Sequence, residues 1–347
     1  MADAAGLIGQ SIGNYRITGE LGHGGMGQVY KAVHQHLRRP AAVKVLKPDM
    51  SAHKEMVQRF FNEALAANVI QHPSLVAVFE AGYLPNGCAF LIMEYLEGET
   101  LGKHLNRARM MPDIQALLIV HQIAAALVPL HAQDIIHRDL KLDNVMLISD
   151  PDIAGGKRVK ILDFGLAKVA ARHQLEAVET RAGVALGTPP YMAPEQWIAA
   201  NKVDGKADVY SLGVMLYMML TGRYPFPAES VKEYQEQHLY SEIPHPAKAN
   251  NTVAARVNDI TRSMLAKKRS DRPSMADVLV SVDQELARRG ALSAAARISM
   301  YGAGSSGSFA PVVDDAATEM RNTTIPVMET DLLSLHIDVE AGESDKT

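Results

Sequence analysis

The stretch Ile135-Ile136-His137-Arg138-Asp139-Leu140-Lys141-Leu142-Asp143-Asn144 decides how the rest of the chain is interpreted. It places a candidate base at Asp139, a cation two residues later at Lys141, and a carboxamide at Asn144. A second apolar run ends in Ile161-Leu162-Asp163-Phe164-Gly165. Short strands would therefore hold two oxygen ligands, Asn144 and Asp163, near one base. A Mg²⁺ site that uses few protein oxygens and leaves room for phosphates needs this arrangement.

The composition indicates a globular chain with no strongly charged partner. Its length of 347 residues favours one large domain, or two smaller ones, plus tails. The residues are 47% hydrophobic and carry a formal net charge of −4. This charge balance does not favour nucleic acid or an anionic membrane as a partner. The single cysteine, Cys88, leaves no internal disulfide and favours a reducing compartment. We therefore expect a cytoplasmic protein.

No stretch of the sequence predicts a membrane span or a signal peptide. Residues 1–10 lack a basic start and a long apolar run. The longest apolar stretches are residues 116–130, which Pro129 and two polar residues interrupt, and residues 209–220, which fall short of the ~20 residues that a span needs. Both stretches are predicted to be buried core helices.

The glycines Gly22, Gly24 and Gly27 form the pattern G-x-G-x-x-G. This pattern alone is weak, because dinucleotide-binding folds use it at the start of a helix. Here residues 28–34 alternate and include Val29 and Tyr30, which predicts a second strand instead. A glycine-rich hairpin over phosphates fits better, since backbone without Cβ atoms can approach them closely.

Lys44 lies in the middle of an apolar strand at residues 41–46. A buried lysine is unfavourable unless it is paired. A helix predicted at about residues 52–69 carries Glu55 and Glu63, either of which could be that partner. Residues 74–82 and 88–94 predict a hairpin, residues 100–133 follow a helical period, and residues 149–158 predict a surface insertion.

Together these motifs resemble those of protein kinases. His-Arg-Asp with Asn144 five residues after the Asp, followed by Asp-Phe-Gly, matches the kinase signature. The Gly-Gly-Met-Gly loop and the segment Gly-Thr-Pro-Pro-Tyr-Met-Ala-Pro-Glu at residues 187–195 are similar to bacterial eukaryote-like (Hanks-type) serine/threonine kinases. The resemblance covers about residues 14–289.

The resemblance implies an α+β fold with two lobes. A small β-rich N-lobe would span about residues 14–94, and a larger helical C-lobe about residues 98–289. Residues 1–13 are expected to form a loose N-terminal arm. Residues 290–347 form a Gly/Ser-containing, acidic stretch, for which we expect a disordered tail with Ser and Thr.

The implied activity is ATP-dependent transfer of the γ-phosphoryl group to protein Ser or Thr hydroxyls, including autophosphorylation, in signalling. Asp139 would accept or orient the hydroxyl proton, and Lys141 would stabilise charge on the moving phosphoryl group and favour Ser/Thr over Tyr. Asn144 and Asp163 would hold Mg²⁺.

The resemblance also implies the ATP site. Lys44, paired with Glu63, would contact the α- and β-phosphates, Met93 would close the rear of the adenine pocket, and backbone near Glu94 and Leu96 would bind the adenine edge. The residues assigned to ATP binding are Leu21, Gly22, His23, Gly24, Gly25, Met26, Gly27, Val29, Ala42, Lys44, Glu63, Met93, Glu94 and Leu96.

Some residues are expected to support the loops around the site. Asp208 should accept backbone N–H bonds from the catalytic loop, and Arg272 should pair with Glu195. The hydroxyl of Thr188 is expected next to Asp139 and Lys141. That leaves Thr180 as the predicted phosphorylation site of the activation loop, with Arg138 as a partner for its phosphate.

Two acidic residues near the cleft suggest a substrate preference. Glu99 follows the predicted hinge and Asp143 lies in the catalytic loop, so both could favour a basic residue N-terminal to the phosphorylated hydroxyl. In the equally weighted alternative, Glu99 contacts the ribose and Asp143 is solvated. The tail, with Thr323 and Thr324, is expected to be dispensable for catalysis and to dock a phospho-dependent partner.

Three other functions share some of these motifs. A non-catalytic pseudokinase scaffold would be favoured by loss of Lys44, Asp139 or Asp163, and all three are present. A small-molecule kinase shares the base and metal residues but usually lacks the segment at residues 187–195. A dinucleotide-binding oxidoreductase would need a helix after Gly27. The sequence does not indicate an oligomeric state.

Overall fold

The computed structural model describes residues 4–162, 188–198 and 203–291, and within them it does not describe the side chains of residues 4, 5, 63 and 65–69. The predictions for Asp163, for Thr180 and for the tail concern residues outside the described ranges.

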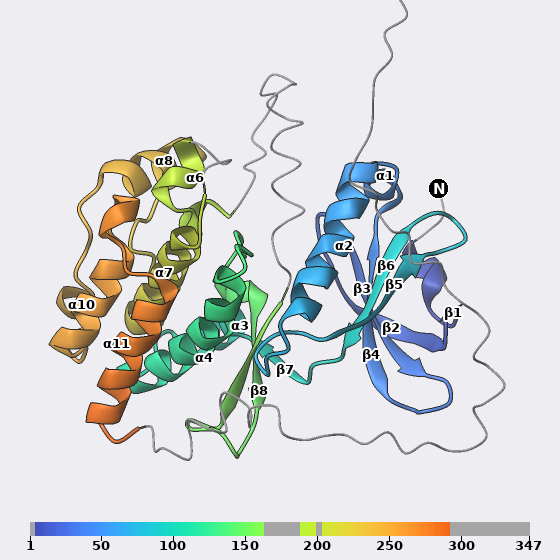
Figure 1. The fold of residues 1–347 in the computed structure, drawn as a ribbon, viewed down its shortest axis with the longest axis horizontal. Coiled ribbons are helices and arrows are strands. Elements are labelled where there is room, and N and C mark those ends of the chain that lie inside the picture. The colour runs from blue at the N-terminus through green and yellow to red at the C-terminus, as the bar shows by residue number, and fades with distance from the viewer. Residues whose placement is uncertain (1–3, 163–187, 199–202, 292–347) are drawn as a thin grey trace, which may run out of the picture. The chain divides into compact units, whose positions relative to one another are not determined.

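The first part of the chain forms a six-stranded antiparallel sheet with the order β1-β2-β3-β4-β6-β5 (Figure 1). One face carries a core that includes Ile17, Tyr30 and Val43. The opposite face packs on α2 through residues such as Phe60 and Leu91. The strands are β1 (Ser11–Ile12), β2 (Tyr15–His23), β3 (Gly27–His34), β4 (Pro40–Leu46), β5 (Val78–Tyr83) and β6 (Ala89–Glu94), and the helices are α1 (Pro48–Ser51) and α2 (Lys54–Val69).

The second part is mostly helical, with a small sheet of order β7-β8-β9. A large apolar core lies between its helices. Its elements are β7 (Gly98–Thr100), α3 (Leu101–Ala108), α4 (Asp113–His131), η2 (Leu142–Asn144), β8 (Val145–Ser149), β9 (Lys157–Ile161), η3 (Pro189–Tyr191), α6 (Pro194–Ile198), α7 (Lys206–Thr221), α8 (Val231–Tyr240), α9 (Pro246–Ala249), α10 (Ala255–Met264), η5 (Arg269–Asp271) and α11 (Met275–Arg288).

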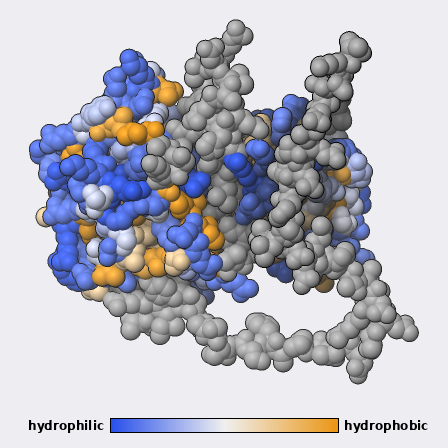
Figure 2. Space-filling view, turned by 45° about the horizontal axis from the view of Figure 1, so that its top comes forward, coloured by the Kyte–Doolittle hydropathy of each residue, from blue (hydrophilic) through white to orange (hydrophobic). Residues whose placement is uncertain are grey.

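Helices α4 and α7 are apolar nearly all round because they lie inside this core. Among the described residues, α4 is the one helix long and apolar enough to cross a membrane by composition, and most of it is buried inside the protein. Both were predicted as core helices, and that prediction is confirmed. On the face drawn in Figure 2, hydrophobic residues form small separate groups among hydrophilic ones.

Two predictions about the N-terminal arm and the first C-lobe helix were wrong. Residues 1–13 do not form a loose arm throughout, since Ser11–Ile12 pairs with β2 and Ile12 is buried. The single helix expected over residues 100–133 is two helices, α3 and α4. Arg109, at φ 64°, ends α3, and Pro112 is the N-cap residue of α4, where it needs no helical N–H bond.

Backbone bonds join the chain before β5 to β9, and a side-chain ion pair joins β9 to the end of β6. The Ile161 N–H donates to Ser74 O at 2.7 Å, and the Val76 N–H donates to Ile161 O at 3.3 Å. Lys160 Nζ lies 2.5 Å from Glu94 Oε1, at the end of β6. The chain before β5 is thus held against β9, the strand that leads to residue 163.

Candidate active site

Three side chains of the described residues, those of Asn144, Lys141 and Thr188, meet around the carboxylate of Asp139, which is 8% exposed. Asn144 Nδ2 donates to Asp139 Oδ2 at 3.0 Å and to its backbone oxygen at 2.9 Å. Lys141 Nζ lies 3.2 Å from Oδ2, and the Thr188 hydroxyl donates to Oδ1 at 3.2 Å. Lys141 also donates to Thr188 Oγ1 at 3.1 Å. The predicted position of Thr188 next to Asp139 and Lys141 is confirmed.

A buried carboxylate from the neighbouring helix fixes this loop. Asp208, in α7 and 1% exposed, accepts the backbone N–H groups of His137 at 2.8 Å and Arg138 at 2.9 Å. It also accepts a bond from His131 Nε2 at 2.8 Å. Burial by itself would raise the pKa of Asp208, but the bonds from His131 and His137 outweigh burial and hold the pKa below its ordinary value. The predicted role of Asp208 is confirmed.

The backbone at Arg138 is left-handed, with φ 66°. A residue with a side chain adopts this conformation rarely, and here it directly precedes Asp139, the candidate base. Burial lowers the pKa of the Arg138 guanidinium, and nearby Arg59 lowers it further, while Asp208 opposes the shift. The Asp208 bonds to the two N–H groups hold the strained turn in place.

The sheet register places the predicted nucleotide residues on one face. Val29 pairs with Lys44, and Ala42 pairs with Met93. Opposite residues of an antiparallel pair share a face, as do residues two apart on one strand. Val29, Ala42, Lys44 and Met93 therefore project to the same side, toward α2, where Lys44 Nζ lies 5.7 Å from the ring centroid of Phe60.

The glycine-rich segment is a hairpin, as predicted. β2 ends at His23 and β3 begins at Gly27, with the Gly24 N–H donating to Gly27 O at 2.8 Å. A Cβ on Gly27 would lie 2.2 Å from the Val45 oxygen, so only glycine fits there. Cβ atoms on Gly22, Gly24 and Gly25 would meet nothing within 4 Å, which leaves this backbone accessible to a ligand. A strand follows, which argues against the dinucleotide-binding alternative.

The predicted hinge follows β6. The Glu94 N–H donates to Ala77 O at 3.0 Å, and the Glu94 carboxylate binds Lys160 and accepts the Ala77 N–H. The side chain of Glu94 is therefore structural, and its N–H is also used, by Ala77. Met93 packs against the apolar group that includes Phe60 and Leu91, between the sheet and α2. Leu96, two residues after Glu94, is half-buried.

The structure does not describe the side chains of two residues predicted to belong to this site, Glu63 and Asp163. Glu63 lies on α2, the helix that faces Lys44, but its side chain is outside the described set. Asp163 is outside the described residues, and its neighbour Leu162 is held at the site. The Leu162 N–H donates to Asn144 O at 2.8 Å, and His137 Nε2 donates to Leu162 O at 3.1 Å.

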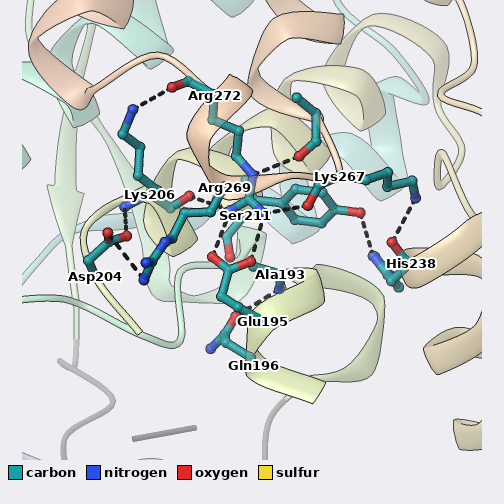
Figure 3. A network of polar contacts seen from close by, with 12 residues as sticks. Ala193, Glu195, Gln196, Asp204, Lys206, Ser211, His238, Lys267, Arg269 and Arg272 are labelled. Atoms are coloured by element: carbon teal, nitrogen blue, oxygen red, sulfur yellow. Dashed lines mark hydrogen bonds and ion pairs between the residues drawn. The ribbon is translucent and has the colours of Figure 1, made fainter. Parts of the chain in front are cut away.

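The predicted pair between Glu195 and Arg272 is confirmed, and it is part of a larger network (Figure 3). The Arg272 side chain is 0% exposed and binds the Glu195 carboxylate with two bonds of 2.7 and 2.6 Å. Its other N–H groups donate to the backbone oxygens of Ala266, Lys206 and Lys267. The network joins α6, which follows the segment carrying Thr188, to the start of α7 and to η5.

One polar cluster near the site was not predicted. The Glu99 carboxylate is already bound within the chain, because Arg107 donates to both of its oxygens at 2.8 Å. His104 Nδ1 lies 2.9 Å from Glu99 Oε1. Glu99 lies in β7, whereas His104 and Arg107 lie on α3, five and eight residues later, so no regular spacing in the sequence indicated this cluster.

Comparison with known proteins agrees with this geometry. A family model described as "Protein kinase domain" matches residues 15–282. Serine/threonine-protein kinase Pkn1 of Myxococcus xanthus is 40% identical over 266 residues, covering 77% of this chain and 37% of that protein. Serine/threonine-protein kinase PrkC of Bacillus subtilis is 34% identical over 262 residues, covering 75% of this chain and 39% of that protein.

The solved kinase domain of PknI from Mycobacterium tuberculosis, a double mutant, aligns with a TM-score of 0.61 and 25% identity over 82% of this chain and 99% of that one. The chain spans 37% of the length of Pkn1, 60% of Myxococcus xanthus pkn3 and 33% of pkn2. The predicted two-lobed fold and the resemblance to bacterial serine/threonine kinases are confirmed, and the chain belongs to the protein kinase family.

Proposed function

We propose that the chain is an ATP-dependent kinase that phosphorylates Ser and Thr hydroxyls of proteins and of itself. The observation that carries this proposal is the group around Asp139. A carboxylate accepts a hydroxyl donor at 3.2 Å, and an ammonium lies 3.2 Å from its second oxygen. A base beside a hydroxyl and a cation is what transfer of a phosphoryl group to an alcohol requires.

The roles of the residues follow from their positions. Asp139 Oδ1 accepts a bond from a hydroxyl, as it does from Thr188, and so orients the attacking oxygen. Lys141 places its positive charge where negative charge gathers in the transition state. Asp208 keeps the loop in this conformation through its bonds to His137 and Arg138.

The nucleotide would lie between the hairpin of Gly24 and Gly25 and the face that carries Val29, Ala42 and Lys44. Lys44 would contact the phosphates, and the backbone of residues 94–96 would bind the adenine. Asn144 would help to hold Mg²⁺. Both bonds that Asn144 makes to Asp139 come from Nδ2, so Oδ1 is the ligand atom that it offers. Bound Mg²⁺ would neutralise charge on the phosphates.

The names of the relatives support Ser/Thr specificity, since Pkn1, pkn3 and PrkC are serine/threonine-protein kinases. The physiological substrates are proteins with exposed Ser or Thr. The buried Cys88 fits the expected cytoplasmic setting, and the tail after residue 290 remains our candidate for a phospho-dependent docking segment.

The test is phosphoryl transfer from labelled ATP with Mg²⁺, by the purified chain, to itself and to a generic Ser/Thr substrate. Asp139→Asn should lower the rate about 10²–10⁴-fold while ATP still binds. Asp134→Asn is the matched control, because it makes the same change at an exposed residue with φ 56°, a conformation that asparagine tolerates well.

The control should keep the wild-type rate. Near-wild-type transfer by Asp139→Asn would reject Asp139 as the base, and no transfer by the wild-type chain with any protein substrate would reject the proposed function.

A further inference from the structure

The strongest unexplained feature is the cluster of Glu99, His104 and Arg107. Glu99 is 26% exposed on its side chain, Arg107 is 66% exposed, and the two are joined by two parallel bonds of 2.8 Å. The bonds from Arg107, and then from His104, lower the pKa of Glu99 to about 2. The carboxylate is therefore ionised and both of its oxygens are bound by one guanidinium, the geometry of strong Arg–carboxylate recognition.

The cluster lies beside the catalytic loop. Glu99 is in β7 and pairs with Leu147 of β8, the strand that begins directly after Asn144. The helix that carries Arg107 also touches this loop, because a Cβ on Gly102 would lie 2.5 Å from Asp143 Oδ1. The two acids expected to attract a basic substrate residue are thus both near the loop, and one of them is already bound by a guanidinium of the same chain.

We propose that Arg107 is a specificity-determining residue, whose guanidinium occupies the Glu99 carboxylate and so competes with a basic residue of the substrate N-terminal to the phosphorylated hydroxyl. This inference rests on the proposed protein kinase activity. It replaces the expectation that Glu99 attracts basic residues directly.

The competition follows from chemistry that the two partners share. A substrate arginine would bind Glu99 with the same planar, two-bond geometry that Arg107 uses, so only one of them can occupy it. A substrate guanidinium would also be repelled by Arg107 itself. Removing Arg107 leaves Glu99 with His104 alone and restores a carboxylate for the substrate.

The test uses serine peptides that differ only in carrying arginine or its neutral isostere citrulline at one position upstream of the serine. The quantity measured is the ratio of kcat/KM for the arginine peptide to that for the citrulline peptide. Exposed ion pairs contribute small factors, and two-bond pairs contribute larger ones, so Arg107→Ala should raise this ratio roughly three- to tenfold.

Two controls isolate the contact. Lys103→Ala removes one positive charge from an exposed position of the same helix and should leave the ratio at its wild-type value. The double variant Glu99→Gln with Arg107→Ala should lose the gain, because the carboxylate is then absent. The KM for ATP, measured in parallel, reports whether Glu99 contacts the ribose instead.

An unchanged ratio in Arg107→Ala would overturn the inference. So would an equal gain in Lys103→Ala, which would point to charge alone, or a gain that survives in the double variant. Fluorescence anisotropy of the same labelled peptides gives the ratio of binding constants without any transfer. If no variant transfers phosphate, the proposed function fails, while the anisotropy ratio still decides whether Arg107 competes for Glu99.

Discussion

Arg272 offers a direct test of how much a fully paired, buried charge contributes to this fold. Its guanidinium has five N–H donors, and five hydrogen bonds of 2.6–3.1 Å use them, two to Glu195 and three to backbone oxygens. Arg272→Met would leave the Glu195 carboxylate, which is 16% exposed, without its ion-pair partner, and it would remove one hydrogen bond from each of three carbonyl oxygens.

Removing one partner of a buried ion pair costs about 3–5 kcal/mol. At roughly 2–4 °C of melting temperature per kcal/mol for a domain of this size, Arg272→Met should lower the Tm by about 6–20 °C. The assay is thermal unfolding followed by circular dichroism. The double variant Glu195→Gln with Arg272→Met should lose much less than the sum of the two single variants.

Arg107→Met is the matched control, because Arg107 binds its carboxylate with the same two-bond geometry from an exposed position. Exposed pairs contribute little to stability, so its Tm should stay close to that of the wild type. A Tm for Arg272→Met as high as that of Arg107→Met would refute the reasoning that burial makes this pair important.

Three further predictions concern the site and the core. Lys44→Met and Glu63→Gln should each cripple phosphoryl transfer, and in a double-mutant cycle their losses should be strongly non-additive; additive losses would argue against a pair. Burial, and then Lys267, lowers the pKa of His238 to about 3, so the unfolded chain binds a proton at this residue below pH ~6.5 and the folded chain does not. The free energy of unfolding should therefore fall as the pH drops from 7 to 4. Over the same pH range, the urea midpoint of His238→Gln should fall less than that of the wild type; an equal fall in both proteins would contradict this. Phosphorylation of Thr180 is expected to order the activation loop, so Thr180→Ala should lower phosphoryl transfer to a peptide, and mass spectrometry should find phosphate on Thr180 in the wild type. Full activity of the variant would leave Arg138 with a structural role only.

The catalytic motifs could be predicted from the sequence because their chemistry fixes both residue type and spacing. Asp139, Lys141 and Asn144 lie within six residues, so local backbone geometry alone brings them together. The contacts of Asp208 and of Arg272 with Glu195 join distant segments, and they were predictable only through the resemblance to a known family.

Other features depended on context that no short pattern carries. The Ser11–Ile12 strand forms because β2 offers a free edge, which is a property of the sheet and not of residues 11–12. The break between α3 and α4 depends on the left-handed Arg109 as well as on Pro112. Glu99 looked available to a substrate because its partner Arg107 lies eight residues away, across a strand-to-helix junction.

The left-handed turn at Arg138 has a consequence for the timing of catalysis. A non-glycine residue in this conformation costs of the order of 1–3 kcal/mol, and the bonds that offset the cost come from Asp208 in the core of the helical lobe. The conformational entropy of the loop is thus lost once, when the chain folds, and not each time a substrate arrives. Under the proposed function, every turnover would begin with Asp139 already in position, on a turn that the bonds from Asp208 tie to the core of the helical lobe.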